Sequence, residues 1–320
     1  MYSILNKNEI KINNEAPSFF INLNLNQVLD SIIKNEEDKN IKKYFYSPLN
    51  NIEDINYRLD VFKELDRKEF YVTFNSCFGR LRKVYERYKA NEYEVSTSWD
   101  GKKTLVRIIN TYIEAIEDLY KELINDKEIK SEAILELIKY IDSFQKSNEF
   151  INLITDVNKL GEIVSKIRYT MVFNGCDIYV SPFDPEHDKD FEPFVKDALR
   201  DFEWESTKEF NYSVNEMTSS KLIDHNVLEA LSHLYKNEFK NVSDFCKKYE
   251  KFYNEDLYKI VSDTKFYLLY DLFMDKIKSA NLPFAYPNFI NDYKEECIDL
   301  YDLALANRLV VRKEEIVLII

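Results

Sequence analysis

The amino-acid sequence predicts a mainly α-helical fold, and three observations lead to this prediction. The chain of 320 residues contains only 4 Gly and 7 Pro, too few for the many tight turns of a β-sandwich or β-barrel. Hydrophobic residues make up 45% of it and aromatic residues 15%, which is ample material for a folded core. Over long stretches the apolar residues recur every three or four positions, the period of one helix face.

The first helices follow an extended opening that ends near Pro17. We expect a short helix at residues 25–33 and then, after a turn, a second one. The apolar stripe of that second helix consists of Leu59, Phe62 and Leu65, which recur with helical spacing.

The rest of the first half reads as a stack of antiparallel helices. A third helix is expected at residues 70–90, and the polar stretch 91–103 reads as a link to the next one. Ser131 is in the position of an N-cap for a later helix. The helices after the link are expected at residues 106–123, 132–145 and 150–169.

The helical spacing of apolar residues is interrupted at residues 170–184. Two short β-rich pieces, 170–173 and 176–180, flank Asn174-Gly175, the strongest short signal for a β-hairpin. An acidic helix at 191–204 and a polar stretch follow. This region therefore reads as an insertion into the helical body.

Helices resume in the last third of the chain. The longest, at 255–280, is apolar on most of its faces, which is typical of a helix at the centre of its domain. Pro283 and Pro287 end it. The two helices before it are expected at residues 219–235 and 242–253.

Charge is unevenly distributed along the chain, whose formal net charge is −13. Residues 71–109 contain eight basic and four acidic side chains, a net charge of +4, whereas residues 177–205 contain three basic and ten acidic ones, a net charge of −7. A polyanion would be repelled by most of this surface. If nucleic acid binds, we expect it to contact the first of these two segments.

The basic face of residues 79–89 is the best candidate for such contact. Arg80, Lys83 and Arg87 lie at positions i, i+3 and i+7 and so share one side of a helix. Tyr85 and Tyr88 are interleaved with them and would suit contact with bases or phosphates. The alternative is an ordinary charged helix surface that pairs with acidic neighbours.

The glycines exclude a phosphate-binding loop within this sequence. No two of them are closer than 14 residues, so neither Gly-x-x-x-x-Gly-Lys-[Ser/Thr] nor Gly-x-Gly-x-x-Gly exists. The four are Gly79, Gly101, Gly161 and Gly175.

The three histidines do not form a recognisable metal-binding pattern. His225 and His233 flank Glu229, but a di-iron bundle needs two Glu-x-x-His pairs, and neither is present. His187-Asp188 has the shape of a phosphohydrolase dyad, yet no earlier histidine exists to complete it. We therefore expect no metal ligands in this chain, and contacts of an ordinary helix surface for Glu229 and His233.

Cysteine use and the N-terminus indicate a cytoplasmic protein. The four cysteines are far apart and lack a C-x-x-C pair, so we expect reduced, partly buried thiols without a catalytic role. The opening MYSILNKNEIK is not a secretory leader, and no run of 18 apolar residues predicts a membrane span. The cysteines are Cys77, Cys176, Cys246 and Cys297.

An ordered set of segments resembles the region that precedes the ATPase domain in bacterial proteins of the MutS family. The likeness is closest to a shorter, clostridial-type branch described as DNA mismatch repair proteins, and it covers most of the chain. The segments are NLNLNQVLDSI, YFYSPLNNIEDINYRLDVFKEL, KIRYTMVFNGCDIYV, VSDTKFYLLYDLFMDKIKSANLPFAYP and IDLYDLALANRLV.

This resemblance implies a multi-helix core, or lever, interrupted by a clamp that closes on DNA. The core would comprise residues 1–169 and 216–300, the clamp-like insertion with its β-hairpin residues 170–215, and the start of a truncated ATPase domain residues 301–320. The apolar residues 316–320 would then be a strand of that domain, whose phosphate loop would follow Ile320. The Gly-x-Phe-Tyr-Glu motif of the mismatch-reading domain is missing from this sequence.

The resemblance also implies partners and cofactors. DNA would be the partner of the full-length protein, which would form a homodimer through the ATPase domain. ATP and Mg²⁺ would be cofactors of that domain, and this chain itself would hold none. Its role would be to couple the nucleotide state to DNA contact. The alternative function is that of a helical protein-interaction module with an acidic surface and no nucleic-acid binding.

Overall fold

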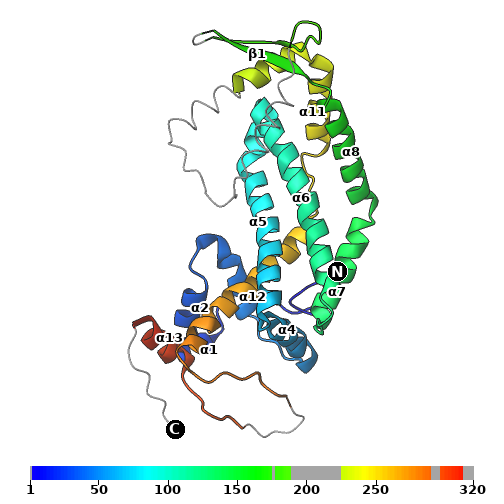
Figure 1. Cartoon of the computed structure of the whole chain (residues 1–320). Coiled ribbons are helices and arrows are strands. Elements are labelled where there is room, and N and C mark those ends of the chain that lie inside the picture. The colour runs from blue at the N-terminus through cyan, green and yellow to red at the C-terminus, as the bar shows by residue number, and fades with distance from the viewer. Residues whose placement is uncertain (1, 175–176, 189–224, 290–295, 313–320) are drawn as a thin grey trace, which may run out of the picture. The chain divides into compact units, whose positions relative to one another are not determined.

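A computed structural model describes residues 2–174, 177–188, 225–289 and 296–312 of the chain (Figure 1). The described residues are mainly helical and include one two-stranded antiparallel sheet, which confirms the predicted fold class at this level. The helices of the first half are α1 (Ser18–Asn22), α2 (Leu25–Ile32), η1 (Glu36–Ile41), α3 (Lys42–Phe45), α4 (Ile52–Leu65), α5 (Lys68–Thr97), α6 (Trp99–Asn125), α7 (Glu132–Gln145) and α8 (Asn148–Val164). The later elements are β1 (Tyr169–Asn174), β2 (Asp177–Pro182), α11 (Lys236–Lys248), α12 (Glu255–Ser279) and α13 (Leu303–Arg312), and residues 225–234 are helical too.

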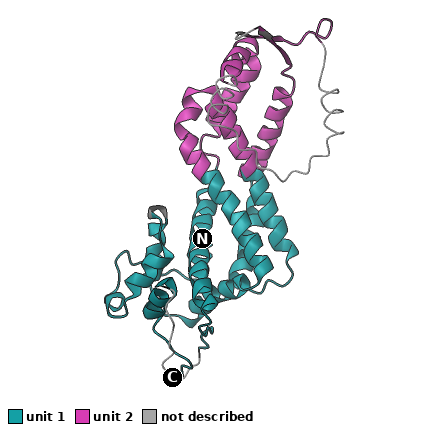
Figure 2. Ribbon diagram, turned by 60° about the vertical axis from the view of Figure 1, so that its left-hand side comes forward, with its two compact units in different colours: residues 1–85, 112–147, 253–320 teal, residues 86–111, 148–252 magenta. Residues whose placement is uncertain are grey.

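The chain divides into two compact units, which Figure 2 shows in different colours. Unit 1 comprises residues 1–85, 112–147 and 253–320, and unit 2 comprises residues 86–111 and 148–252. Helices α5 and α6 each contribute residues to both units. The described part of the predicted clamp-like insertion, residues 170–174 and 177–188, belongs to unit 2, and the division predicted at residue 215 lies outside the described residues.

Helix α12 is at the centre of unit 1, as its apolar faces predicted. It contacts α2, η1, α4 and α13, and it buries residues on most of its sides. Asn254 caps its first turn by accepting a hydrogen bond from the Leu257 amide at 3.0 Å. The helix ends before Asn281, whose φ of 59° is left-handed.

The N-terminal segment is anchored in the core of unit 1. Ile4 and Leu5 are fully buried. The Tyr267 hydroxyl of α12 donates to the Ile4 carbonyl oxygen at 2.6 Å, and Arg58 Nε of α4 donates to the Leu5 carbonyl oxygen at 3.1 Å. These bonds satisfy backbone groups that have no strand or helix partner.

A buried carboxylate joins α4 to the start of α7. Glu64 is 5% exposed, and its Oε1 atom accepts from the amides of Lys130 at 2.5 Å and Ser131 at 2.9 Å. Its Oε2 atom accepts from Arg67 Nη2 at 2.6 Å. Ser131 is at the N-cap position as predicted, but its buried hydroxyl has no hydrogen-bond partner among the described residues. The predicted cap position is therefore correct, but the expected side-chain hydrogen bond is not formed.

The polar link predicted at residues 91–103 is helical instead. In unit 2, α5 continues to Thr97, and α6 begins at Trp99. Ser98 caps α6 by accepting from the Gly101 amide at 2.9 Å, and the buried Asn91 side chain donates to the Gly101 carbonyl oxygen at 2.9 Å. A Cβ atom at Gly101 would lie 2.1 Å from the Glu94 carbonyl oxygen, so this close turn requires glycine.

The predicted β-hairpin is confirmed. Strands β1 and β2 pair antiparallel, with Tyr169 opposite Pro182 and Asn174 opposite Asp177. Val180 of β2 packs against a core cluster of unit 2 formed by Val227, Leu231 and Phe239. The acidic helix predicted at 191–204 lies outside the described residues.

Helix α13 belongs to unit 1 and contacts α2 and α12. Asn307 Nδ2 donates to the Ser31 hydroxyl of α2 at 2.8 Å. The strand predicted at residues 316–320 lies outside the described residues. Within the described ranges, the helices are too short or too polar to cross a membrane.

Candidate functional site

The three predicted DNA-contact residues lie on α5, and they differ in burial and in the unit to which they belong. Arg80 and Lys83 belong to unit 1, and Arg87 belongs to unit 2. Arg80 is half-buried, whereas Lys83 and Arg87 are exposed. Neither exposed side chain has an ion-pair or hydrogen-bond partner among the described residues.

Arg80 is engaged by acidic residues of α6. Its guanidinium forms an ion pair with Asp118, and its Nη2 atom lies 3.8 Å from Glu114 Oε2. A phosphate that bound Arg80 would have to displace these carboxylates. Lys83 and Arg87 are therefore the two cations of the predicted set that are available to an anion.

The two tyrosines predicted to support this basic face pack elsewhere. Tyr88 is 2% exposed and donates to the Glu250 carbonyl oxygen at 2.6 Å. The ring of Tyr85 stacks on that of Tyr258 of α12, with centroids 3.6 Å apart. The expectation of aromatic support was wrong, because both side chains turn toward neighbouring elements.

No metal-binding group is found within the described ranges, where no three His, Cys, Asp or Glu side chains cluster suitably. His225 Nδ1 lies 2.7 Å from Asp100 Oδ2, and His187 Nδ1 lies 2.8 Å from Asp184 Oδ2. Each is a pairing of one imidazole with one carboxylate.

The described cysteines are free thiols. Cys77 and Cys246 are buried, and Cys297 is exposed. Burial raises the pKa of Cys77, and it raises the pKa of Cys246 to about 11. Both buried thiols are thus protonated near neutral pH and are poor nucleophiles.

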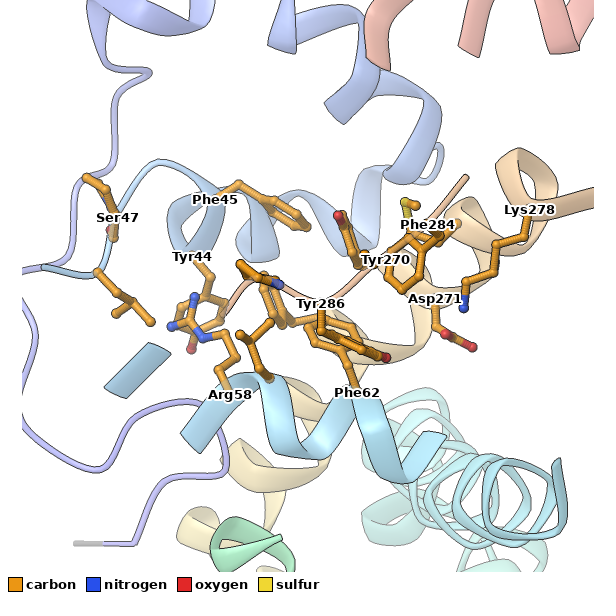
Figure 3. Close-up of a pocket in the computed structure, with 17 residues that line it drawn as sticks. Tyr44, Phe45, Ser47, Arg58, Phe62, Tyr270, Asp271, Lys278, Phe284 and Tyr286 are labelled. Atoms are coloured by element: carbon orange, nitrogen blue, oxygen red, sulfur yellow. The ribbon is translucent and has the colours of Figure 1, made fainter. Parts of the chain in front are cut away.

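An aromatic cavity in unit 1, which we did not predict, has both charged and aromatic side chains in its wall (Figure 3). Its volume is about 430 Å³. Helices α4 and α12 form two sides, and residues 284–287, which follow α12, form another. The seven rings in its wall belong to Tyr44, Phe45, Phe62, Phe266, Tyr270, Phe284 and Tyr286.

The polar groups of this cavity lie at its two ends. Figure 3 shows Asp271 and Lys278 on one side and Ser47 and Arg58 on the other. The pKa of Asp271 is raised to about 6, first by burial and then by the nearby Asp275 and Asp66 carboxylates, while Lys278 acts in the opposite direction. The carboxyl group of Asp271 is therefore ionised at pH 7.5 at a cost in free energy.

We predict that Asp271→Asn stabilises the protein at pH 8. The folded-state pKa of about 6 is above the ordinary value of 3.8, so the folded state binds the proton more tightly than the unfolded state. The ionised side chain therefore destabilises the fold increasingly as the pH rises from about 3.8 to about 6; this effect is constant above pH 6 and disappears below about pH 4. Urea unfolding should show a gain of about 1–2 kcal/mol at pH 8, discounted for partial screening, and a much smaller gain at about pH 4.5.

Asp275→Asn provides the matched control for that prediction. Asp275 is exposed, lies one turn further along α12 and does not line the cavity. Its replacement should change stability much less at either pH. A loss of stability for Asp271→Asn at pH 8, or a gain of equal size at both pH values, would contradict the assignment.

A second, more apolar cavity of about 480 Å³ lies in unit 2. Helices α6, α8 and α11 line it, and Lys103 and Arg107 are its charged side chains. Gly161 of α8 faces open space there, since a Cβ atom would meet nothing within 4 Å.

Comparison of the chain with protein-family models, curated proteins and solved structures finds no match.

Proposed function

We propose that this chain is the lever and clamp-like part of a MutS-type DNA-processing ATPase and couples the nucleotide state of an ATPase domain to DNA contact. The observation that carries the proposal is that α5, with 30 residues, and α6, with 27 residues, each contribute to both compact units. At 1.5 Å per residue such helices extend over about 40–45 Å. Long packed helices are suited to transmitting a displacement between distant sites.

The connectivity of unit 2 also supports this proposal. The chain leaves unit 1 twice, for residues 86–111 and 148–252, and returns each time. The second excursion contains the β-hairpin, where the resemblance to the MutS family puts a clamp. The glycine spacing rules out a phosphate loop in residues 1–320, so we assign no nucleotide step to these residues.

We predict that Lys83→Ala combined with Arg87→Ala weakens DNA binding on the order of tenfold at low salt. Each lost phosphate contact should reduce the slope of log Kd against log salt by about 0.9, so the slope should fall by about 2. Arg80→Ala alone should have a smaller effect, because Asp118 and Glu114 already neutralise Arg80. Fluorescence anisotropy with a labelled duplex, titrated at several salt concentrations, measures both quantities.

The control removes the same charge elsewhere. Lys139 of α7 and Lys240 of α11 are exposed, so the double Ala variant at these positions has the same net charge as the test variant. It should retain the wild-type affinity and slope. Equal affinity and slope in the test variant and the wild type would remove this face from the proposal.

A second candidate function is a helical protein-interaction module that binds a basic partner. The neutralisation of Arg80 by two carboxylates and the net charge of −13 favour it. A gel-shift titration at low salt distinguishes the two functions. A chain that does not retard any duplex under those conditions would contradict the DNA-contact function and favour the interaction module.

A further inference from the structure

The side chain of Asp271 has no bonding partner among the described residues. The residue is 7% exposed and lines the aromatic cavity of unit 1. Its carboxylate has no hydrogen bond and no ion pair there, but its oxygens are not fully enclosed and keep some contact with solvent. A largely desolvated carboxylate in the wall of a cavity often marks a site that a ligand completes.

Other polar side chains of the cavity wall are already engaged. Tyr44 donates to Asp263 at 2.5 Å, and Tyr286 donates to Asp66 at 2.6 Å. Lys278 Nζ donates to Asp66 at 2.9 Å and lies 4.5 Å from the centroid of the Phe284 ring. The ammonium group nearest to Asp271 is thus held by a different carboxylate.

The charges around Asp271 favour a cation. Asp271, Asp275 and Asp66 supply three carboxylates within electrostatic range, and Lys278 supplies one ammonium. The local balance is therefore −2 when all four groups are ionised. Aromatic faces are attractive surfaces for cations, and this end of the cavity has the rings of Tyr270, Phe284 and Tyr286 (Figure 3).

We propose that this cavity binds a small arylalkyl primary amine, whose ammonium group donates to the Asp271 carboxylate and whose ring packs against the aromatic walls. A primary ammonium has three N–H donors for the carboxylate oxygens of Asp271, whereas a quaternary ammonium has none. The cavity volume of about 430 Å³ is within the range of small-molecule sites, about 300–1,000 Å³. The site is independent of the function proposed above.

Isothermal titration calorimetry with 2-phenylethylamine at pH 7.5 tests the proposal on the whole chain. We expect saturable binding to the wild type, and affinity at least tenfold lower for its trimethylammonium analogue and for 2-phenylethanol, which cannot supply a charged N–H donor. Asp271→Asn should weaken amine binding at least tenfold while leaving the weak binding of 2-phenylethanol unchanged. This difference separates loss of the charge from loss of the fold.

Two further variants complete the design. Asp275→Asn removes the same charge from the same helix outside the cavity, and it should change the Kd of the amine less than threefold. Phe284→Ala, at a partly exposed position of the wall, should weaken the amine and the alcohol alike. No binding of 2-phenylethylamine to the wild type at 10 mM, or equal affinity for wild type and Asp271→Asn, would overturn the proposal.

Amine binding should also depend on pH. The groups that interact electrostatically with Asp271 are Asp275 and Lys278 of α12 and Asp66 at the end of α4. Tyr71 of α5 and Tyr286 after α12 do so too, since burial first and Asp271 among other groups raise the pKa of each. Because the pKa of Asp271 is about 6, the carboxylate becomes protonated as the pH falls through that value. The affinity should decrease from pH 7.5 to pH 5.5 in the wild type and stay constant in Asp271→Asn.

Discussion

Gly101→Ala is expected to destabilise unit 2 by more than about 3 kcal/mol, or to prevent it from folding. The added Cβ atom would lie 2.1 Å from the carbonyl oxygen and 2.2 Å from the carbonyl carbon of Glu94. Both contacts are with backbone atoms of α5, so a change of rotamer cannot relieve them. The two helices would have to separate, which would also break the 2.9 Å bond from Asn91 to Gly101.

Gly161→Ala is the matched control for this prediction. Gly161 lies inside α8 of the same unit, and a Cβ atom there meets no atom within 4 Å. Alanine should therefore stabilise the helix by about 0.5–1 kcal/mol. Circular dichroism during thermal and urea unfolding measures both variants. Equal stability of the two would show that α5 and α6 do not approach as closely as described.

Glu64→Ala should cost about 3–5 kcal/mol, because it removes one partner of a buried charged network. The amides of Lys130 and Ser131 would lose their acceptor at the start of α7, and Arg67 would keep Asp126 and Glu128 as its ion-pair partners among the described residues. Glu64→Gln should cost less, since its oxygen can still accept from the two amides. Its amide nitrogen, however, would face the Arg67 guanidinium.

Asp60→Ala is the control on the same helix. Asp60 and Lys63 form an ion pair at 2.8 Å near the surface of α4. A single ion pair near the surface contributes little to the free energy of unfolding. Urea unfolding should rank the variants as Asp60→Ala close to wild type, then Glu64→Gln, then Glu64→Ala. A Glu64→Ala variant as stable as Asp60→Ala would refute the network.

The helices were predictable where a local pattern repeats. The apolar residues of 255–280 surround the helix, and α12 is indeed buried on most sides. Asn174-Gly175 between two β-rich pieces likewise predicted the β1–β2 pairing. Such patterns depend on residues a few positions apart, so the sequence of one segment is enough to predict its secondary structure.

Residues 91–103 were misread because their composition is that of a loop. Serine, glycine and many charges favour turns. In the structure the serine caps a helix and the glycine permits close contact with Glu94. Only the close approach of α5 and α6 explains why serine and glycine occur at the start of a helix here.

In the candidate sites too, local spacing was predictable and contacts between distant residues were not. Spacing put Arg80, Lys83 and Arg87 on one helix face, but nothing local indicated that Asp118, 38 positions away, neutralises Arg80. For the aromatic cavity, the sequence contains one signal: an aspartate within the apolar run YLLYDLFM. An acidic side chain in such a run is expected to be buried, which costs free energy unless a hydrogen-bond partner, an ion-pair partner or a ligand binds it.

By itself, the sequence determined that this protein is mainly helical, where most helices run, and that a β-hairpin interrupts them, because these features follow from neighbouring residues. The tertiary structure alone decided which cations are free, which carboxylate is buried without a partner, and where a helix turn requires glycine. These properties depend on distances between residues far apart in the chain, which periodicity and composition do not contain.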